Sequence, residues 1–388
     1  MLFIGRDLDT EEDLYIDSSK SRAILICGKR GSGKSYTMGV IIEELLAEGQ
    51  ATILVVDPMG TFHTMCLPNL DQERLLWDWG SSPEGLRLRL LVPGDPVVRY
   101  GDAEIVSRME ARGLSFVQLA INPSDISPEA WCDLFNIGIN DPMGIALTKA
   151  VIKCQRKHGL DYFIPQIIDR IELDPRASQV TKDALTNRLE TATLWGFFSD
   201  DRYREVDEVL ERQAINVLDL STIDPGRYGR RPLIISVLGR DLFVKRSIAR
   251  RREELGLDAR TARTWLFIDE AHQFVPSGKS SLSKEILIRW VKEGRGPGLS
   301  FVVASQQPSA IDNEVLSQCD VILSHSMTTS EDKTALNRLT KDYMGGELRT
   351  YIDRIARTGQ AVLVDDDVER VSMVHVRPRK SKPGGSEA

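Results

Sequence analysis

The chain alternates between short apolar runs and longer segments in which apolar residues recur at helical spacing. Several runs, such as TILVVD, TWLFID and LSFVVAS, are apolar at almost every position. A strand with such a run is usually buried on both faces, as in a parallel sheet covered by helices. The pattern predicts an α/β core with strands over Ala23–Cys27, Thr52–Asp57, Leu86–Val92, Phe116–Ile121, Ile215–Leu220, Thr264–Asp269, Leu299–Ser305, Val321–Ser324 and Gln360–Val364.

The pattern changes between residues 122 and 213. There the apolar residues follow the spacing of helix faces, for example in PEAWCDLFNI, GIALTKAVIKCQRKHG and VTKDALTNRLETATLWGFF. We therefore predict a core formed by residues 1–121 and 214–376, interrupted by an all-α insertion over 122–213. The tail RPRKSKPGGSEA, residues 377–388, has no apolar residue able to pack, which predicts a disordered basic tail.

Composition excludes several classes of protein. Hydrophobic residues make up 41% of the 388 residues and charged residues 28%, which is ordinary for a globular chain. No apolar run approaches the ~20 residues that cross a bilayer, and the acidic N-terminal stretch lacks the pattern of a signal peptide. The five cysteines are scattered singly without a CxxC pair, which argues against a disulfide framework or a zinc site. We therefore expect a cytoplasmic protein with no membrane segment.

The formal net charge is −7, yet one stretch of the chain is strongly basic. Residues 226–263 contain eleven Lys or Arg residues and four Asp or Glu residues. A basic stripe on an acidic protein can mark a site for a polyanion. The same residues can also form a solvated helix face, because VKRSIARRREEL offers Arg–Glu pairs at helical spacing. The candidate nucleic-acid contacts are Arg246, Arg250, Arg251 and Arg252.

The segment GKRGSGKS, residues 28–35, lies between an apolar strand and a helix. It matches the phosphate-binding pattern G-x-x-x-x-G-K-[ST] in full and in the required context. Glycines let the backbone curl so that N–H groups approach phosphate oxygens, and the positive end of the following helix faces the same anion. We expect Lys34 to reach the β- and γ-phosphates and Ser35 to ligate Mg²⁺. The nucleotide-binding candidates are Gly28, Lys29, Arg30, Gly31, Ser32, Gly33, Lys34, Ser35 and Tyr36.

Two carboxylates follow the apolar run TWLFI. Phosphoryl transfer needs a group that holds the metal and a group that positions the attacking water. Asp269 is the candidate for the first role and Glu270, as general base, for the second. A further strand ends before Gln306, whose amide is able to hydrogen-bond the γ-phosphate or the attacking water. The alternative is that Gln306 and Gln307 only begin a loop before Pro308.

These motifs in combination resemble the HerA–FtsK superfamily of ring-shaped DNA-pumping ATPases, most closely the HerA branch. The resemblance covers most of residues 20–378 apart from the helical insertion. It implies a RecA-like core with a mostly parallel sheet flanked by helices, ATP and Mg²⁺ as cofactors, and a ring of six subunits with duplex DNA in its pore. It runs through ICGKRGSGKSYTMGVIIEELL, ILVVDPMGTFH, INVLDLS, FIDEAHQFVP, VKEGRGPGLSFVVASQQPSAIDNEVLSQCDVIL and ARTGQAVLV.

The resemblance implies roles for the residues that match the family's main motifs. Lys34 and Ser35 match the nucleotide-binding loop. Asp269 and Glu270 match the metal-holding and catalytic carboxylates, and Gln306 matches the sensor glutamine. These assignments agree with the roles expected from the residues alone.

Two further residues match the family at other motifs. Arg295, in EGRGPG, matches an arginine that such rings commonly supply to the nucleotide of the neighbouring subunit. Asp57 matches the aspartate of an Asp-Pro-x-Gly box, which implies a position near the metal. The alternative for Asp57 is a strand-ending turn with Pro58 and Gly60.

The chain departs from the family pattern at two points. HerA proteins usually carry a β-barrel domain ahead of the phosphate-binding loop, and a loop that starts at Gly28 leads us to expect a chain without that domain. The family often has Glu-Tyr after Asp-Pro-x-Gly, where this chain has Thr61 and Phe62. Any role of that glutamate is therefore absent or moved.

Three functions remain open at this point. The first is an ATP-hydrolysing ring that translocates or unwinds double-stranded DNA and works with a nuclease or another effector protein. The second is a nucleotide-binding ring that acts as assembly platform and regulator of an antiphage defence effector. The third is a DNA transfer or packaging ATPase.

Overall fold

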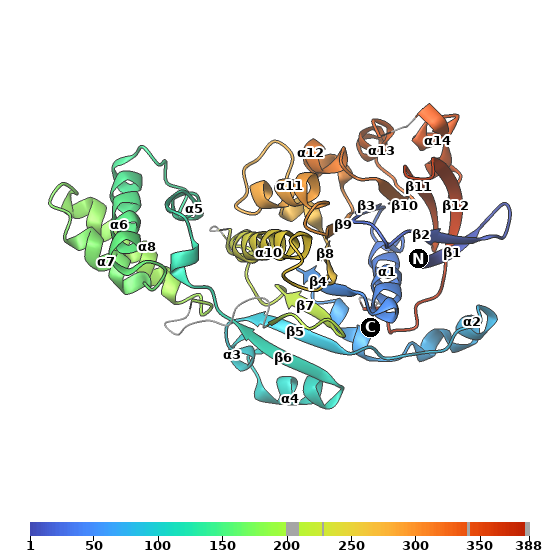
Figure 1. Cartoon of the computed structure of the whole chain (residues 1–388), viewed down its shortest axis with the longest axis horizontal. Helices are drawn as coiled ribbons and strands as arrows, with labels where there is room; N and C mark the ends of the chain where they lie inside the picture. Colours follow the sequence, from blue (N-terminus) through green and yellow to red (C-terminus); the bar gives the residue numbers. More distant parts are fainter. Residues whose placement is uncertain (199–208, 227–228, 340–341, 385–388) are drawn as a thin grey trace.

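One mixed sheet forms the centre of the molecule (Figure 1). The structure, a computed structural model, describes residues 1–198, 209–226, 229–339 and 342–384. In these residues twelve strands form the sheet in the order β2-β1-β12-β11-β10-β3-β9-β8-β4-β7-β5-β6. Neighbouring strands from β10 to β6 are parallel, and those from β2 to β10 are antiparallel. The sheet is therefore mostly parallel, with an antiparallel extension at one edge.

Every strand predicted from the apolar runs is present, and its ends lie within two residues of the predicted ones. The predicted strands are β3 (Ala23–Cys27), β4 (Ala51–Asp57), β5 (Leu88–Pro93), β6 (Leu114–Leu119), β7 (Ile215–Asp219), β8 (Arg263–Ile268), β9 (Leu299–Ser305), β10 (Val321–Ser324) and β11 (Gln360–Asp365).

Three strands at the antiparallel edge were not predicted. They are β1 (Leu2–Asp7), β2 (Asp13–Ile16) and β12 (Arg370–Val376), and they extend the sheet beyond β11. Each is short or mixes polar with apolar residues; in β2 only every second residue is buried. Strands with one solvated face do not produce the continuous apolar run that identifies the parallel strands.

Helices cover both faces of the sheet. Adjacent residues of β3 belong to two apolar clusters, with Leu25 in one and Ile24 in the other. Helix α1 (Lys34–Glu48) contributes to the cluster that contains Ile24. Helices α10 (Arg230–Glu254) and α11 (Lys284–Glu293) contribute to the cluster on the opposite face. This double burial explains why the parallel strands are apolar at nearly every position.

The other helices of the core are shorter. They are α2 (Glu73–Asp78), α3 (Pro96–Tyr100), α4 (Ala103–Ala111), α12 (Asn313–Leu316), α13 (Ser330–Asn337) and α14 (Leu348–Asp353). Among the described residues, no helix combines the length and the apolar character that crossing a membrane requires.

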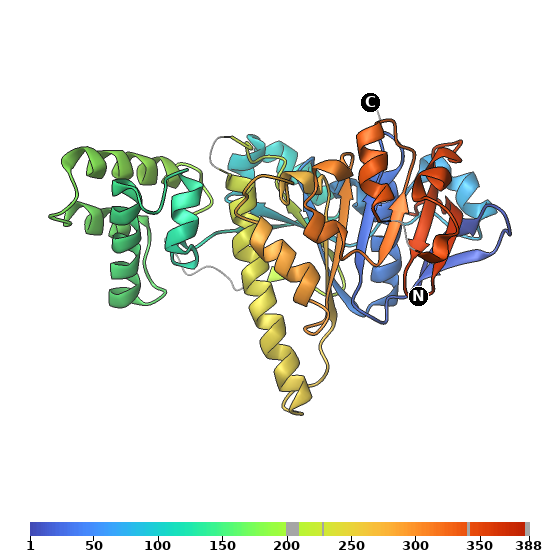
Figure 2. The same ribbon diagram turned by 90° about the horizontal axis from the view of Figure 1, so that it is seen from above.

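Four helices stand beside the sheet as a group of their own (Figures 1 and 2). They pack against one another around buried side chains that include Trp131, Tyr162 and Leu189. All four lie in the segment predicted as an all-α insertion, of which residues 199–208 are outside the described part, so its C-terminal boundary stays a prediction. The helices are α5 (Pro128–Leu134), α6 (Pro142–His158), α7 (Ile164–Glu172) and α8 (Gln179–Thr193).

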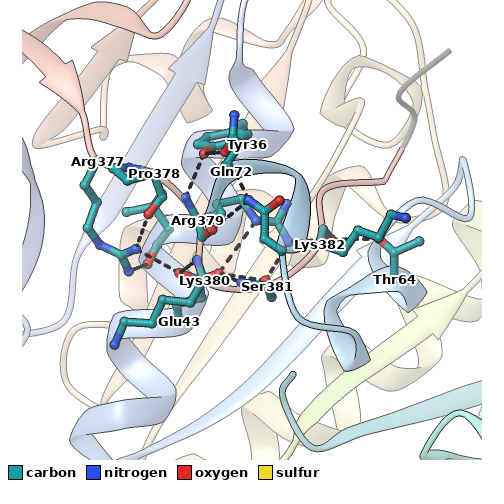
Figure 3. A network of polar contacts seen from close by, with 12 residues as sticks. Tyr36, Glu43, Thr64, Gln72, Arg377, Pro378, Arg379, Lys380, Ser381 and Lys382 are labelled. Carbon is teal, nitrogen blue, oxygen red and sulfur yellow. Dashed lines mark hydrogen bonds and ion pairs between the residues drawn. The ribbon is translucent and has the colours of Figure 1, made fainter. Parts of the chain in front are cut away.

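The prediction of a disordered tail is wrong for residues 377–384. This segment follows β12, and the residues Arg377 and Arg379 are only 4% and 2% exposed. Both arginines lie near Glu43 of α1, a carboxylate that is itself buried (Figure 3). Pairing with this remote charge orders a segment whose own composition offers no apolar side chain to pack. Residues 385–388 lie outside the described part.

Candidate active site

The phosphate-binding loop connects β3 to α1 through a backbone that requires glycine. Gly31 and Gly33 have φ angles of 74° and 113°, which residues with a side chain rarely adopt. A Cβ atom added at Gly28 would lie 2.7 Å from the Cβ atom of His325, so a side chain there has no room. Helix α1 begins directly after the loop, at Lys34, and therefore presents its unpaired N–H groups to an anion held there.

The side chain of Lys34 is buried against the loop and lies near two carboxylates. Its amine donates a hydrogen bond to the backbone oxygen of Lys29 at 3.1 Å. Burial lowers the pKa of Lys34, and the charges of Glu270 and Asp269 oppose this shift. The amine needs only to exchange the backbone oxygen for a phosphate oxygen to bind a nucleotide.

The other predicted loop residues have different surroundings. Lys29 and Arg30 are exposed at the tip of the loop. The hydroxyl of Ser32 donates to the backbone oxygen of Lys29 at 2.8 Å and so stabilises the turn. The hydroxyl of Tyr36 donates to Gln72 at 2.6 Å, so this side chain is held by the protein and its backbone N–H group is the part that remains for a phosphate.

A hydrogen bond joins the phosphate-binding loop to the acidic strand. The hydroxyl of Ser35 donates to Oδ2 of Asp269 at 3.1 Å, although the two residues are 234 positions apart in the sequence. Asp269 is 3% exposed, and burial together with the charge of Glu270 raises its pKa to about 6. Two of the three residues predicted for the metal site, Ser35 and Asp269, are therefore neighbours.

Glu270 and Gln306 form the second pair of the site. Strand β9 lies between β3 and β8, so Gln306, which follows β9, lies between the loop and the acidic residues. Its amide Nε2 donates to Oε1 of Glu270. The other carboxylate oxygen, Oε2, is buried and accepts no hydrogen bond from the described residues, and Nδ1 of His272 is 3.4 Å from it. Glu270 thus has one oxygen oriented by the amide and one available for a water molecule.

Asp57 has the contacts of a turn residue. Its Oδ1 accepts hydrogen bonds from the N–H groups of Met59 and Gly60 at 3.1 and 2.8 Å, and its Oδ2 accepts one from Phe62 at 2.8 Å. Burial, with a smaller contribution from nearby carboxylates that include Asp269, raises the pKa of Asp57 to about 7. These contacts favour the strand-ending turn over a direct role at the metal, which stays a prediction.

The donor set fits a magnesium ion that is held mainly by phosphates and water. In the described part of the chain, no group of three or more His, Cys, Asp or Glu side chains could hold a metal by itself. Mg²⁺ at nucleotide sites usually takes one or two protein oxygens and completes its octahedron with phosphate oxygens and water. Ser35 and Asp269 could supply those two oxygens, and Glu270 would remain outside the set.

Arg295 lies at the amino ends of the parallel strands, whereas the phosphate-binding loop lies at their carboxyl ends. It precedes β9, whereas Gln306 follows it, and a seven-residue strand is about 20 Å long. Its side chain is 77% exposed and lies 3.6 Å from Oδ2 of Asp320. Arg295 therefore does not reach the loop of its own chain.

The four predicted nucleic-acid contacts lie on α10 and differ in their surroundings. Arg246 is mostly buried and donates to the backbone oxygen of Pro297 at 2.8 Å, so it is a structural residue. Arg250 pairs with Glu254 at 3.0 Å, and Arg252 pairs with Asp258 at 2.5 Å. Arg251 is exposed near the end of the helix.

These pairs support the alternative reading of a helix face with internal ion pairs for part of the basic stretch. Residues 227–228 of that stretch lie outside the described part.

The structure also brings Arg295 and the basic stretch together, which the sequence did not predict. A cavity of about 430 Å³ lies at the edge of the sheet where β9 begins. Its lining includes two carboxylates, Glu253 and Asp367, and more cationic groups than these two can neutralise. The cationic residues are Lys20, Arg246, Arg250, Arg260, Arg263 and Arg295.

His325 was not identified from the sequence, although it packs against Gly28 of the phosphate-binding loop. It follows β10 and is fully buried. Its Nε2 lies 2.9 Å from the hydroxyl of Thr37 in α1, and its Nδ1 lies 2.9 Å from the backbone oxygen of Gln360. Burial lowers its pKa to about 4. A single histidine after a strand has no motif around it, so only the packing against Gly28 reveals its position.

Comparison with known proteins agrees with this geometry. Residues 2–233 match the family model described as "Helicase HerA, central domain". The chain belongs to this family. The resemblance noted from the motifs is thereby confirmed.

Two HerA relatives match along nearly the whole chain. The DNA double-strand break repair helicase HerA of Sulfurisphaera tokodaii is 23% identical over 410 residues, which cover 99% of this chain and 70% of the relative. The protein of the same name from Sulfolobus acidocaldarius is 23% identical over 95% of this chain and 67% of its own length.

Two solved structures share the fold of this HerA-family chain. VirB4 of Thermoanaerobacter pseudethanolicus superposes with a TM-score of 0.59 at 15% identity and covers 97% of this chain and 96% of its own. The conjugative coupling protein TrwB gives a TM-score of 0.53 at 12% identity over 99% and 91% of the two chains. The predicted RecA-like α/β core with a mostly parallel sheet is confirmed.

We expect His325 to make the stability of the fold sensitive to acid. Its pKa is about 4 in the folded chain, whereas an unfolded histidine titrates near about 6.5, so only the unfolded chain binds the extra proton between these values. The contribution of His325 to the free energy of unfolding should therefore fall by roughly 1–3 kcal/mol as the pH decreases through this window. Asp57 and Asp269, whose pKa values are raised in the folded chain, contribute with the opposite sign, so the effect of His325 is read as a difference between variants.

Urea unfolding at a series of pH values between about 7.5 and about 4.5 measures this contribution. The variant His325→Gln, whose amide can keep both hydrogen bonds, lacks this titration, so its free energy of unfolding should gain on that of the wild type as the pH falls. His158→Gln, at the end of α6, is the control and should behave as the wild type does. An identical pH dependence in the wild type and in His325→Gln would show that this prediction is wrong.

Proposed function

We propose that the chain is a ring-forming ATPase of the cytoplasm that uses ATP hydrolysis to translocate or unwind double-stranded DNA. The observation that carries the proposal is the cluster at the end of β3, β8 and β9. There the hydroxyl of Ser35 meets Asp269, and Gln306 meets Glu270, beside the amine of Lys34. A metal-holding pair, an oriented base and a cation around one loop are the parts that phosphoryl transfer requires.

Each residue of the cluster has a distinct task in this proposal. Lys34 and the N–H groups at the start of α1 bind the phosphates. Ser35 and Asp269 would hold Mg²⁺, which would supply positive charge next to the phosphates. Glu270 accepts the proton of the attacking water through its free oxygen, while Gln306 keeps that carboxylate in place.

A ring is proposed because, among the described residues, no arginine is hydrogen-bonded or ion-paired to Asp269, Glu270 or Gln306. Such an arginine is worth ~10³–10⁵ in rate when a neighbouring protein supplies it. Arg295 is exposed and lies at the far edge of its own sheet, so it can act only on the nucleotide of another subunit. We propose a homo-hexamer, in keeping with the family resemblance, with nucleotide between subunits.

DNA is the proposed substrate because the relatives are named DNA repair helicases and the chain offers a suitable basic surface. Arg251 is exposed, and six cationic side chains line the cavity near Arg295 beside two carboxylates. Arg250 and Arg295 also lie near carboxylates outside this lining, so the surface is basic but partly paired. Contacts of this kind bind phosphates of any sequence and weaken as salt increases.

We further propose a nuclease or other effector protein as partner. The platform, transfer and packaging functions remain alternatives, because the likeness to VirB4 and TrwB concerns the fold.

The role of Glu270 can be tested by changing its charge alone. Glu270→Gln keeps the shape of the side chain but cannot accept a proton, so ATP binding should persist while turnover slows by ~10²–10⁴-fold. Steady-state phosphate release and fluorescent-nucleotide titration measure the two properties. Glu190→Gln, on the exposed surface of α8, should leave both unchanged. Turnover near the wild-type rate in Glu270→Gln would remove Glu270 from the role of general base.

The sharing of a site between subunits can be tested by mixing two inactive variants. Lys34→Ala should not bind nucleotide, and Arg295→Ala should bind it but hydrolyse it poorly. In mixed rings, some interfaces combine an intact Arg295 with an intact loop from the other variant, so part of the activity should return.

A labelled-subunit assay confirms that subunits exchange. Recovery at no mixing ratio, despite exchange, would mean that Arg295 does not act on a neighbour's nucleotide.

A further inference from the structure

The segment after β12 crosses the helix that begins at the phosphate-binding loop. We call residues 377–384 the C-terminal strap. Figure 3 shows residues 377–382 of the strap between Tyr36 and Glu43 of α1 on one side and Thr64 on the other. The strap therefore contacts two parts of the chain that flank the nucleotide site: α1 and the segment that follows the turn at Asp57.

Glu43 is the centre of the contact with α1. It is 3% exposed, yet its carboxylate receives a dense set of donors from the strap. Arg377 donates to Oε2 at 2.8 Å, and Ser381 donates to Oε1 from its backbone at 2.8 Å and from its hydroxyl at 2.6 Å. The backbone N–H group of Lys380 adds a bond at 3.1 Å. A buried carboxylate with this many partners holds the strap in one position.

Arg379 continues the contact toward the start of α1. The residue is 2% exposed, and its guanidinium carbon lies 5.8 Å from the centre of the Tyr36 ring. Gly39 of α1 provides the space, because a Cβ atom added there would lie 2.5 Å from the guanidinium carbon. The backbone N–H group of Arg379 donates to the hydroxyl of Tyr36 at 2.7 Å. The strap thus contacts Tyr36, the residue that directly follows Ser35, through both a hydrogen bond and the ring face.

The other side of the strap is bonded to the segment after β4. The N–H group of Lys382 donates to the backbone oxygen of Leu67 at 2.8 Å, and the hydroxyl of Thr64 donates to the backbone oxygen of Lys382 at 3.0 Å. The side chain of Asn69 donates to the backbone oxygen of Arg379 at 2.8 Å. Gly384 packs so closely on Thr61 that a Cβ atom on the glycine would clash with the Thr61 backbone.

We propose that the C-terminal strap positions the phosphate-binding helix, with Arg379 as the positioning residue that acts through Tyr36. The inference rests on the proposed nucleotide site. Lys34 and Ser35 form the first turn of α1, so a small rotation of this helix moves both side chains relative to Asp269. Misplacement of a reacting or binding group by about 1 Å is enough to cost a large factor in affinity or rate.

The test separates positioning from folding by comparing two variants that disturb the same contact in different ways. Arg379→Ala removes the guanidinium. Gly39→Ala removes no polar group but displaces the guanidinium of Arg379 from its place against α1, and the helix should still form. Alanine is also favoured over glycine within a helix by about 1 kcal/mol, which supports folding of this variant. Lys380→Ala is the control, because the strap uses only the backbone of Lys380 in its bonds to Glu43 and Asn69.

Titration with a fluorescent ATP analogue in the presence of Mg²⁺ and thermal unfolding are measured for each full-length chain. We expect Arg379→Ala and Gly39→Ala to bind the analogue roughly tenfold more weakly than the wild type, and Lys380→Ala to match the wild type. Gly39→Ala should unfold in one cooperative transition, at a melting temperature no lower than that of Arg379→Ala. The double variant should be no weaker than Arg379→Ala alone, because both changes act on one contact.

Two results would overturn the inference. If the wild type binds the analogue and Gly39→Ala binds it equally well, the strap has only a structural role, while the proposed function stands. If the wild type itself does not bind the analogue, the proposed nucleotide site fails and the inference fails with it. Should Arg379→Ala not fold, Gly39→Ala decides the question.

Discussion

The parallel register of β3, β9 and β8 determines where each residue of the candidate active site lies. Cys27 at the end of β3 pairs with Ser305 at the end of β9, and Ile268 at the end of β8 pairs with Val303. The carboxyl ends of these three strands therefore lie side by side. Parallel strands place the residues that follow them at one common edge, where ligands of α/β proteins bind. The loop, the two carboxylates and Gln306 meet there for this reason.

The same register also places Arg295 and its basic neighbours far from the candidate active site. Residues that precede the parallel strands lie at the opposite edge, and Arg295 is among them. Its neighbours at that edge form a basic cavity, which collects charge far from the phosphate-binding loop. The ATPase proposal and the ring proposal thus both rest on strand direction, which puts the candidate active site at the carboxyl ends of the parallel strands and exposed Arg295 at their amino ends.

Much of this arrangement could be predicted because it depends on local sequence. The apolar runs of β3, β9 and β10 gave their bounds without error, and the glycines of the loop are needed for its backbone. Asp269 and Gln306 could be paired with the loop because each follows a buried strand.

The remainder depends on contacts between distant residues. Arg377 and Arg379 are buried because Glu43 accepts them, which no pattern within the tail can reveal. His325 likewise has no motif and is defined by Thr37. Arg246 was predicted to contact nucleic acid, but its guanidinium is occupied by the backbone of Pro297.

The central claim is that this site hydrolyses ATP in order to move DNA. Steady-state ATP turnover of the purified chain, with and without duplex DNA of unrelated sequences and with Lys34→Ala as blank, tests it most directly. The account predicts that duplex DNA of any sequence raises turnover by about tenfold or more, and that added salt reduces this stimulation. Turnover that no DNA changes, in a chain that binds ATP and has assembled, would contradict the account.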